Sequence, residues 1–232
     1  MITRNLPPPP VPGPHSLSPR ALAIAGWLSL ALAIAAFSTL AWNVAESTRI
    51  IQWDAAVTGW VTLHRGDFFV AAMTLITQVN SVGGVFILSA IFAGILARMR
   101  EWYWILTLVL AVGGGALLNV ALKAIFERAR PEVQDPLLIL HTYSFPSGHT
   151  AGATLFYGVL AAFLVTRTYD RRLRAAIVAC AIVMVLLVAL SRVYLGVHYV
   201  SDVVAAMCSS TAWLVLCLTG VHHLVRQRMA QP

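Results

Sequence analysis

The chain has 232 residues, of which 59% are hydrophobic and 11% are charged, and its formal net charge is +7. Runs of about 18 or more apolar residues recur along it, each long enough to cross a hydrocarbon core roughly 30 Å thick. This composition excludes an ordinary soluble domain, and because the basic residues flank the apolar runs, it also argues against a nucleic-acid-binding surface.

The first 20 residues differ from the rest of the chain. Prolines at positions 7–10, 12 and 14 prevent a helix there, and we expect residues 1–20 to form a disordered cytoplasmic tail. The remainder, residues 21–228, is predicted to form one membrane domain. Its first apolar run, residues 21–45, is too long for the core of a signal peptide and is the first predicted membrane span.

Residues 47–65 have a mixed composition. Apolar residues, among them Trp53 and Trp60, recur there at helical spacing beside charged ones, which predicts an amphipathic helix lying at the membrane interface. Residues 68–79 either extend this helix or begin the next crossing, and the Asn-Ser-Val-Gly-Gly cluster at 80–84 predicts a break before the second span.

Further apolar runs complete the bundle. The second span ends near residue 97, and the others lie at about residues 102–126, 150–165, 173–190 and 197–225. The sequence therefore predicts an all-α polytopic membrane helix bundle with six transmembrane helices and one interfacial amphipathic helix. In the third span, the glycines at 113–115 favour close helix packing. Asn119 lies one turn before Lys123 and is either functional or makes a helix-to-helix hydrogen bond.

Six antiparallel crossings bring four helix ends to one face of the membrane: the end of the third span, the start of the fourth, the end of the fifth and the start of the sixth. The basic residues give the orientation, because arginines concentrate on the cytoplasmic side. At the face opposite these four ends we expect Arg4, Arg20, Arg98, Arg100, Arg167, Arg171, Arg172, Arg174, Arg226 and Arg228. We therefore expect a multi-pass membrane protein with both termini in the cytoplasm and the four helix ends at the outer (periplasmic or extracellular) face.

A polar segment, residues 191–202, separates the last two apolar runs and contains His198 and Asp202. These residues are four apart, so if the segment is helical the imidazole and the carboxylate lie on one face within contact distance. A carboxylate that accepts a hydrogen bond from one ring nitrogen leaves the other nitrogen free to attack an electrophile. The alternative is an ordinary polar pair at the start of a helix.

Several cations are expected at the same face. Lys123, Arg130 and Arg192 would supply fixed charge and bidentate donors for a phosphate. The segment 147–149, Ser-Gly-His, would add the free N–H groups of a helix N-terminus, although a serine there is also a common N-cap. His198 would then attack phosphorus, while His149 would protonate the departing oxygen and later activate water. No metal or other cofactor is expected, because the sequence has no carboxylate cluster that would hold magnesium.

Three motifs carry a resemblance to a known family. In chain order they are Lys123-x6-Arg130-Pro131, Pro146-Ser147-Gly148-His149 and Ser191-Arg192-x5-His198-x3-Asp202. Together they resemble the signature motifs of the type 2 phosphatidic acid phosphatase superfamily, strongly over residues 123–202 and loosely elsewhere. The superfamily also includes soluble vanadium haloperoxidases, but six lipid-crossing runs argue against that branch.

The resemblance assigns roles residue by residue. It implies phosphate binding by Lys123, Arg130, Ser147, Gly148 and Arg192, a nucleophile at His198, an orienting carboxylate at Asp202 and an acid/base at His149. Arg128 resembles an additional arginine of bacterial members, and we expect it to be a secondary anion contact.

The leading hypothesis is an integral membrane phosphatase that removes a terminal phosphate from a lipid phosphate or pyrophosphate, without a metal ion, through a phosphohistidine. Undecaprenyl pyrophosphate is the first candidate substrate, because the compact chain resembles bacterial phosphatases that recycle this carrier; phosphatidic acid and phosphatidylglycerol phosphate follow. The alternatives are a lipid phosphotransferase that uses the same site and a non-catalytic lipid transporter. The resemblance to bacterial members implies a location in a bacterial cytoplasmic (inner) membrane. A membrane lipid phosphate and the bilayer are the expected partners, and the oligomeric state stays open.

Overall fold

The computed structural model describes residues 19–46, 49–133 and 142–230, and these residues form helices and short connections without any strand. The helices are α1 (Pro19–Ala45), α2 (Arg49–Leu63), α3 (Asp67–Val79), α4 (Val82–Arg98), α5 (Trp102–Leu108), the π-helix η1 (Val109–Gly113), α6 (Gly114–Phe126), α7 (Gly148–Thr166), α8 (Arg171–Tyr194) and α9 (Val200–Ala230). The predicted all-α class is confirmed. The proline-rich tail lies outside the described residues, apart from its last two, which begin α1.

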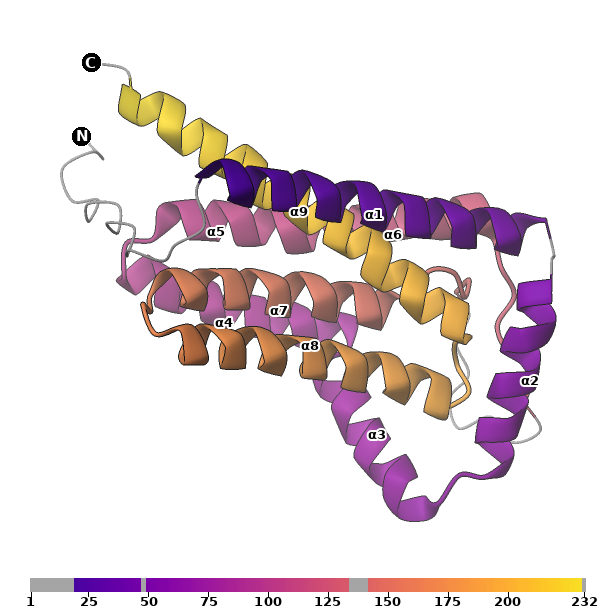
Figure 1. The fold of residues 1–232 in the computed structure, drawn as a ribbon. Coiled ribbons are helices and arrows are strands. Elements are labelled where there is room, and N and C mark those ends of the chain that lie inside the picture. The colour runs from indigo at the N-terminus through magenta and orange to yellow at the C-terminus, as the bar shows by residue number, and fades with distance from the viewer. Residues whose placement is uncertain (1–18, 47–48, 134–141, 231–232) are drawn as a thin grey trace.

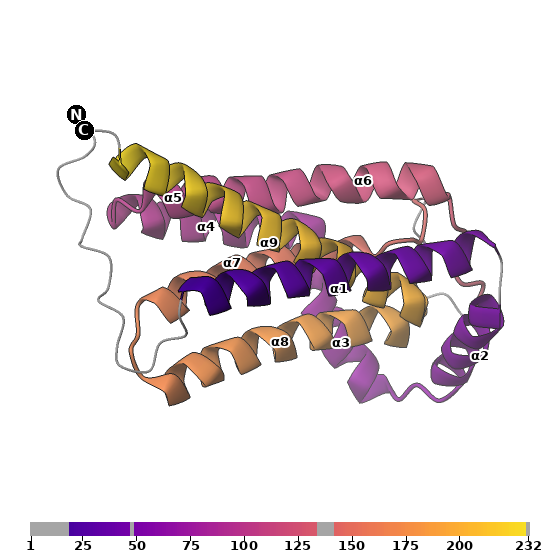
Figure 2. The ribbon, with the colours of Figure 1, turned by 45° about the horizontal axis from the view of Figure 1, so that its top comes forward.

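The long helices run side by side, and α2 lies across one end of the bundle (Figures 1 and 2). Within the described residues, five helices are long and apolar enough to cross a membrane, one of which is the continuous run Trp102–Phe126 formed by α5, η1 and α6. The pair α3 and α4, bent by 53° at the break between them, would make a sixth span. The structure thus matches the predicted multi-pass membrane bundle.

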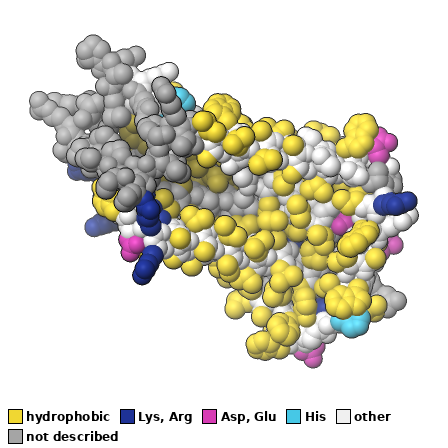
Figure 3. Space-filling view, in the orientation of Figure 1, with side chains coloured by type: hydrophobic (Ala, Val, Ile, Leu, Met, Phe, Trp, Pro, Cys, Tyr) yellow, Lys and Arg dark blue, Asp and Glu magenta, His cyan; other side chains and the backbone are white. Residues whose placement is uncertain are grey.

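The surface of the bundle is apolar along its sides. Trp27 is 64% exposed and Leu117 is 74% exposed. Figure 3 shows hydrophobic side chains covering the length of the helices, while charged side chains gather chiefly toward the two ends. This distribution suits a belt of lipid around the middle of the molecule.

Helix α7 lies at the centre of the packing and contacts both α8 and α9, as well as α4 and α6. Close approach to α6 depends on glycine, because a Cβ at Gly115 would lie 2.2 Å from Cδ1 of Leu155 on α7. This agrees with the prediction that small residues in the third span favour close packing. The π-helix was not predicted; there, Trp213 of α9 donates to the carbonyl of Leu110 at 3.1 Å.

Two helix boundaries differ from the expected ones in ways that matter for the polar segment 191–202. Helix α8 continues to Tyr194, so that Arg192 lies in its last turn and is buried. Helix α9 begins at Val200, so that His198 lies in the turn between the two helices rather than on a helix. The contact between His198 and Asp202 was predicted on the assumption that the whole segment is helical. That assumption is wrong at His198.

The break between α3 and α4 falls at the predicted Asn-Ser-Val-Gly-Gly cluster. Ser81 is the N-cap of α4, and its hydroxyl accepts a hydrogen bond from the N–H of Gly84 at 3.0 Å. Asn80 is buried, and its side-chain oxygen accepts from the hydroxyl of Tyr157 at 3.0 Å. The resulting bend brings the last turn of α3 toward α8, with which α3 packs.

Candidate active site

The motif residues meet at the end of the bundle opposite the start of α1 and the end of α9, where α6 ends, α7 begins, α8 ends and α9 begins (Figures 1 and 2). The charges of Arg192, His198, Arg130 and Lys123 all act on the imidazole of His149, which is half-buried in the first turn of α7. The structure therefore brings both histidines and the three predicted cations together.

The imidazole of His198 and the carboxylate of Asp202 are in contact. Nδ1 of His198 lies 3.2 Å from Oδ2 of Asp202, and both side chains are almost fully buried. Oδ2 also accepts from the hydroxyl of Ser144 at 2.5 Å and from the N–H of Tyr199 at 2.9 Å. Asp202 lies in the first turn of α9 and reaches back to the turn before it, which explains how the contact forms although His198 is not helical.

The other ring nitrogen of His198 points toward a cation. Its Nε2 lies 3.3 Å from Nη1 of Arg130, and because a guanidinium can only donate, Nε2 must be the acceptor. The proton of the neutral ring then resides on Nδ1, which donates to Asp202. Burial lowers the pKa of His198 to about 4, although the hydrogen bond and charge of Asp202 oppose that shift. At neutral pH the ring is neutral, with an unprotonated Nε2.

Arg192 is the most deeply buried of the three cations, with 1% of its surface exposed. Its Nη1 donates to the hydroxyl of Thr77 at the end of α3, while its buried Nε has no hydrogen-bond partner among the described residues. A buried charged group with a free donor is costly unless a ligand or partner accepts it. This nitrogen is thus available to an anion.

Lys123 and Arg130 hold the loop that leads into α7. Nζ of Lys123 donates to the carbonyls of Tyr143 and Ser144. Arg130 donates to the carbonyl of Thr142 at 2.7 Å and to the carbonyl of Val197 at 2.7 Å. Burial lowers the pKa of Arg130, while the charge of Asp202 opposes the shift. These contacts fix two positive charges beside the histidines.

The start of α7 has the form of an anion cradle. Ser147 occupies the N-cap position, but its side chain makes no capping hydrogen bond. Ser147 is therefore not an ordinary side-chain N-cap. The first N–H groups of α7 therefore remain for another acceptor. The N–H of Ser147 donates to the carbonyl of Asp202 at 3.1 Å, which ties this cradle to the start of α9.

Asn119, in the third span, makes a hydrogen bond to the loop before α7. Its Nδ2 lies 3.4 Å from the carbonyl of Pro146. A Cβ at Gly148 would lie 3.3 Å from Oδ1 of Asn119, so the glycine allows α6 to approach the cradle closely. The hydrogen bond of Asn119 thus goes to the loop before α7 and not, as one of the two predicted roles had it, from helix to helix.

Arg128 was expected to be a secondary anion contact, and that role stays a prediction. Its guanidinium is buried between two carboxylates, Asp54 of α2 at 2.8 Å and Asp202 of α9 at 2.7 Å. These bonds account for its charge without an anion.

Sequence reasoning missed four residues of this site: Asp54, Thr77, Ser144 and Ser201. Their partners are remote in the chain, so no local spacing reveals them. The sequence does contain one indication of a role for Asp54: it is the only acidic residue in the amphipathic segment that forms α2.

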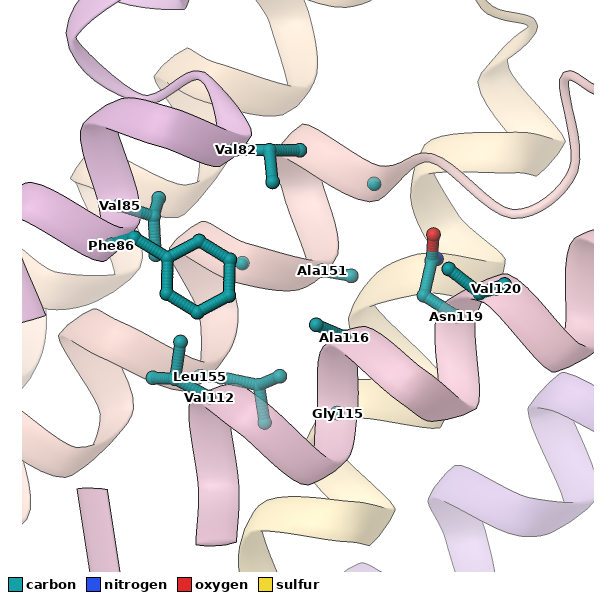
Figure 4. A pocket seen from close by; sticks show the side chains of 12 residues that line it. Val82, Val85, Phe86, Val112, Gly115, Ala116, Asn119, Val120, Ala151 and Leu155 are labelled. Atoms are coloured by element: carbon teal, nitrogen blue, oxygen red, sulfur yellow. The ribbon is translucent and has the colours of Figure 1, made fainter. Parts of the chain in front are cut away.

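An apolar pocket of about 100 Å³ opens beside the cradle, between α4, η1 with α6, and α7. Figure 4 shows Val85 and Phe86 facing Leu155 and Val112 across it, with Asn119 at one side. Gly148, the first residue of α7, also lines the pocket, so an apolar space adjoins the anion cradle. Among the described residues, no group of three or more His, Cys, Asp or Glu side chains is arranged to hold a metal ion.

Comparisons with known proteins agree with this arrangement. Residues 102–226 match the PAP2 superfamily. Phosphatidylglycerophosphatase B of Bacillus subtilis (strain 168) is 37% identical over 152 residues, which are 65% of this chain and 74% of that protein.

Two solved structures are similar to this one. The crystal structure of the first transmembrane PAP2 type phosphatidylglycerolphosphate phosphatase from Bacillus subtilis superposes with a TM-score of 0.77 at 30% identity, covering 84% of this chain and 96% of that one. The crystal structure of Aquifex aeolicus LpxE, at 24% identity, shares the fold, with a TM-score of 0.59 over 72% of this chain and 95% of that one. The chain therefore belongs to the PAP2 (type 2 phosphatidic acid phosphatase) superfamily and is a membrane lipid phosphatase of that type.

Proposed function

We propose that this phosphatase removes the terminal phosphate of a phospholipid phosphate at the outer membrane face, with His198 as nucleophile. The observation that carries the proposal is the meeting of two imidazoles with three buried or half-buried cations, one of which has an unpartnered Nε. Cations that repel one another in a desolvated place need an anion to offset their charge. A terminal phosphate fits this requirement.

In the first half of the reaction, the lone pair of Nε2 of His198 attacks phosphorus, and the bond from phosphorus to the lipid oxygen breaks. The electron pair goes to that oxygen, which takes a proton from the imidazolium of His149. Bound phosphate favours the charged form of His149, because it brings negative charge next to the ring. Lys123, Arg130 and Arg192, with the hydroxyl of Ser147 and the N–H of Gly148, stabilise the charge on the other phosphate oxygens.

In the second half, neutral His149 takes a proton from water, and the hydroxide attacks the phosphohistidine. The P–N bond breaks, its electron pair returns to Nε2, and inorganic phosphate leaves. Asp202 holds the imidazole of His198 in the tautomer that presents Nε2, and it stabilises the positive ring that forms during attack. Every proton and electron pair is thus carried by this chain, the substrate and water.

Phosphatidylglycerol phosphate is the first substrate to test, because the relative from Bacillus subtilis is named phosphatidylglycerophosphatase B. The apolar pocket beside Gly148 supports a substrate with a hydrocarbon tail, since a tail segment could lie there while the phosphate occupies the cradle. Undecaprenyl pyrophosphate and phosphatidic acid have the same combination of tail and terminal phosphate, and both remain candidates.

The orientation belongs to the same proposal. Arg98, Arg100, Arg167 and the arginines that begin α8 lie at the end of the bundle opposite the site. The positive-inside rule makes that end cytoplasmic, so the site faces the periplasm or cell exterior from the inner membrane.

The decisive assay measures phosphate released by purified protein in detergent from phosphatidylglycerol phosphate, phosphatidic acid and undecaprenyl pyrophosphate. We expect release without any added acceptor alcohol, and a loss of several orders of magnitude in His198→Ala. Release only when an acceptor is added would identify a phosphotransferase instead. Full activity in His198→Ala would contradict the proposed nucleophile.

A further inference from the structure

We infer that Asp54, through Arg128, is a positioning residue for the reaction, and that Arg128 is a bridge between carboxylates rather than a phosphate contact. This inference rests on the proposed role of His198 and Asp202. It concerns the oxygen of Asp202 that does not face His198.

The two carboxylate oxygens of Asp202 have separate tasks. Oδ2 receives the bonds from His198, Ser144 and the N–H of Tyr199. Oδ1 receives Nη1 of Arg128 at 2.7 Å. A carboxylate held at only one oxygen can rotate about its last bond, whereas bonds at both oxygens fix its plane. Arg128 therefore sets the plane in which Oδ2 meets the imidazole.

Arg128 is itself fixed by α2. Its Nη2 donates to Oδ2 of Asp54 at 2.8 Å, and its Nη1 also donates to the hydroxyl of Ser201 at 2.7 Å. The ring of Tyr199 covers the guanidinium, with 4.2 Å from Cζ to the ring centroid. One planar fork thus joins carboxylates on two helices, a geometry that guanidinium provides and ammonium does not.

Asp54 also binds the start of α9 directly. Its Oδ1 accepts from the N–H of Ser201 at 3.1 Å, and the Ser201 hydroxyl donates to its other oxygen. The first N–H groups of a helix lack partners within the helix and carry partial positive charge, so a carboxylate from another helix is well placed there. The link from α2 to Asp202 therefore consists of two parallel connections, one through Arg128 and one through the backbone of α9.

Helix α2 has a buried carboxylate on one side and exposed tryptophans on the other. Asp54 is 3% exposed, whereas Trp53 beside it is 73% exposed and Trp60 is 64% exposed. The tryptophans suit the headgroup level of a membrane, while the carboxylate faces the site. A buried carboxylate needs a partner to offset its desolvation, and the partner of Asp54 is the guanidinium of Arg128, which also binds Asp202.

The test compares three variants with wild type: Arg128→Lys, Asp54→Asn and the double variant Asp54→Asn/Arg128→Gln. Lysine keeps the charge that a phosphate would use but loses the fork, so we expect kcat to fall by about tenfold to a hundredfold. KM and inhibition by vanadate, a mimic of bound phosphate, should stay within about twofold of wild type. The double variant removes both members of the Asp54–Arg128 pair and so leaves no charged Asp54 without its partner, and its loss of kcat should be no larger than that of the more impaired single variant.

Matched controls are Arg49→Lys and Asp67→Asn, which make the same chemical changes at exposed positions of α2 and α3 and should leave kcat unchanged. Wild-type kcat in Arg128→Lys or in the double variant would overturn the inference. So would a parallel rise in KM and weakening of vanadate inhibition, since these would make Arg128 a phosphate contact. Failure of all three variants to fold would overturn it too, because the link would then serve structure alone.

His198→Ala in the same series separates this inference from the proposed function. If that variant keeps its turnover, the proposed function fails. If it loses turnover while Arg128→Lys does not, only the positioning role of Arg128 and Asp54 fails.

Discussion

Arg192 carries a positive charge into a place from which water is excluded. Its side chain is 1% exposed, the hydroxyl of Thr77 accepts one of its N–H groups, and its buried Nε has no partner among the described residues. In the absence of substrate such a group costs stability, and with a phosphate bound it contributes a charge-assisted hydrogen bond. Stability and activity should therefore respond in opposite directions when it is removed.

The first prediction uses Arg192→Met, which replaces the cation with an apolar side chain of comparable length. We expect kcat to fall by about 10²–10³-fold, the usual cost of one missing donor to transition-state charge. The apparent Tm of the substrate-free protein in detergent should not fall, because a buried unpaired charge has been removed. Unchanged kcat, or a large drop in Tm with wild-type kcat, would show that Arg192 is a structural residue.

The second prediction concerns the titration of His198 in the substrate-free protein. Burial lowers its pKa to about 4, so the ring should stay neutral as the pH falls from 7 and become protonated only near pH 4. An ordinary exposed histidine would become protonated near pH 6.5. Titration of ¹⁵N-labelled histidine by NMR, with the signal assigned by its absence in His198→Gln, measures this directly. A midpoint at or above pH 6.5 would contradict the buried, Asp202-paired geometry.

At the scale of elements, the bend between α3 and α4 places Thr77, near the end of α3, within hydrogen-bond distance of Arg192. The bend depends on Gly84, because a Cβ there would lie 2.1 Å from the carbonyl oxygen of Val79 and 2.8 Å from its carbon. These atoms belong to the backbone, so no side chain can move aside to make room. At the neighbouring Gly83, a Cβ would meet nothing within 4 Å.

The third prediction follows from that contrast. Gly84→Ala should lower the unfolding free energy by about 1–3 kcal/mol and reduce kcat/KM, because the bend must open and shift Thr77 away from Arg192. Gly83→Ala should leave both unchanged or raise stability slightly, since alanine favours a helix. Thermal unfolding in detergent and the phosphate-release assay measure the two quantities. Equal behaviour of the two variants would rule out a steric requirement at the bend.

At the scale of the whole molecule, the sidedness of the site remains a prediction from charge. The start of α1 and the end of α9 lie at the end of the bundle opposite the site (Figure 1), and the flanking arginines favour the cytoplasm for that end. A periplasmic phosphatase reporter fused after Glu132, beside the site, should be active, and one fused after Ala230 should be inactive. A cytoplasm-dependent fluorescent reporter should give the opposite pattern. Reversal of both patterns would place the site in the cytoplasm.

The sequence was sufficient for features that depend on local pattern. Span lengths follow from runs of apolar residues, and the meeting of His149, His198 and Asp202 at one face follows from motif spacing together with antiparallel crossings. The links to Asp54 and Thr77 were out of reach because they join residues between 74 and 147 positions apart and depend on how α2 and α3 turn back toward α8 and α9. The role expected for Arg128 did not take Asp54 into account. Motif spacing indicates which cations lie near one another, but it does not show which carboxylates bind them.

The account depends most on a covalent bond between phosphorus and Nε2 of His198. Quenching the purified protein in alkaline detergent during turnover of a ³²P-labelled lipid phosphate tests this bond most directly. The account predicts a label on the protein that survives base and is lost in acid on prolonged exposure, that maps to His198, and that is absent from His198→Gln. Label at any other residue, or undiminished turnover of His198→Gln without label, would contradict it.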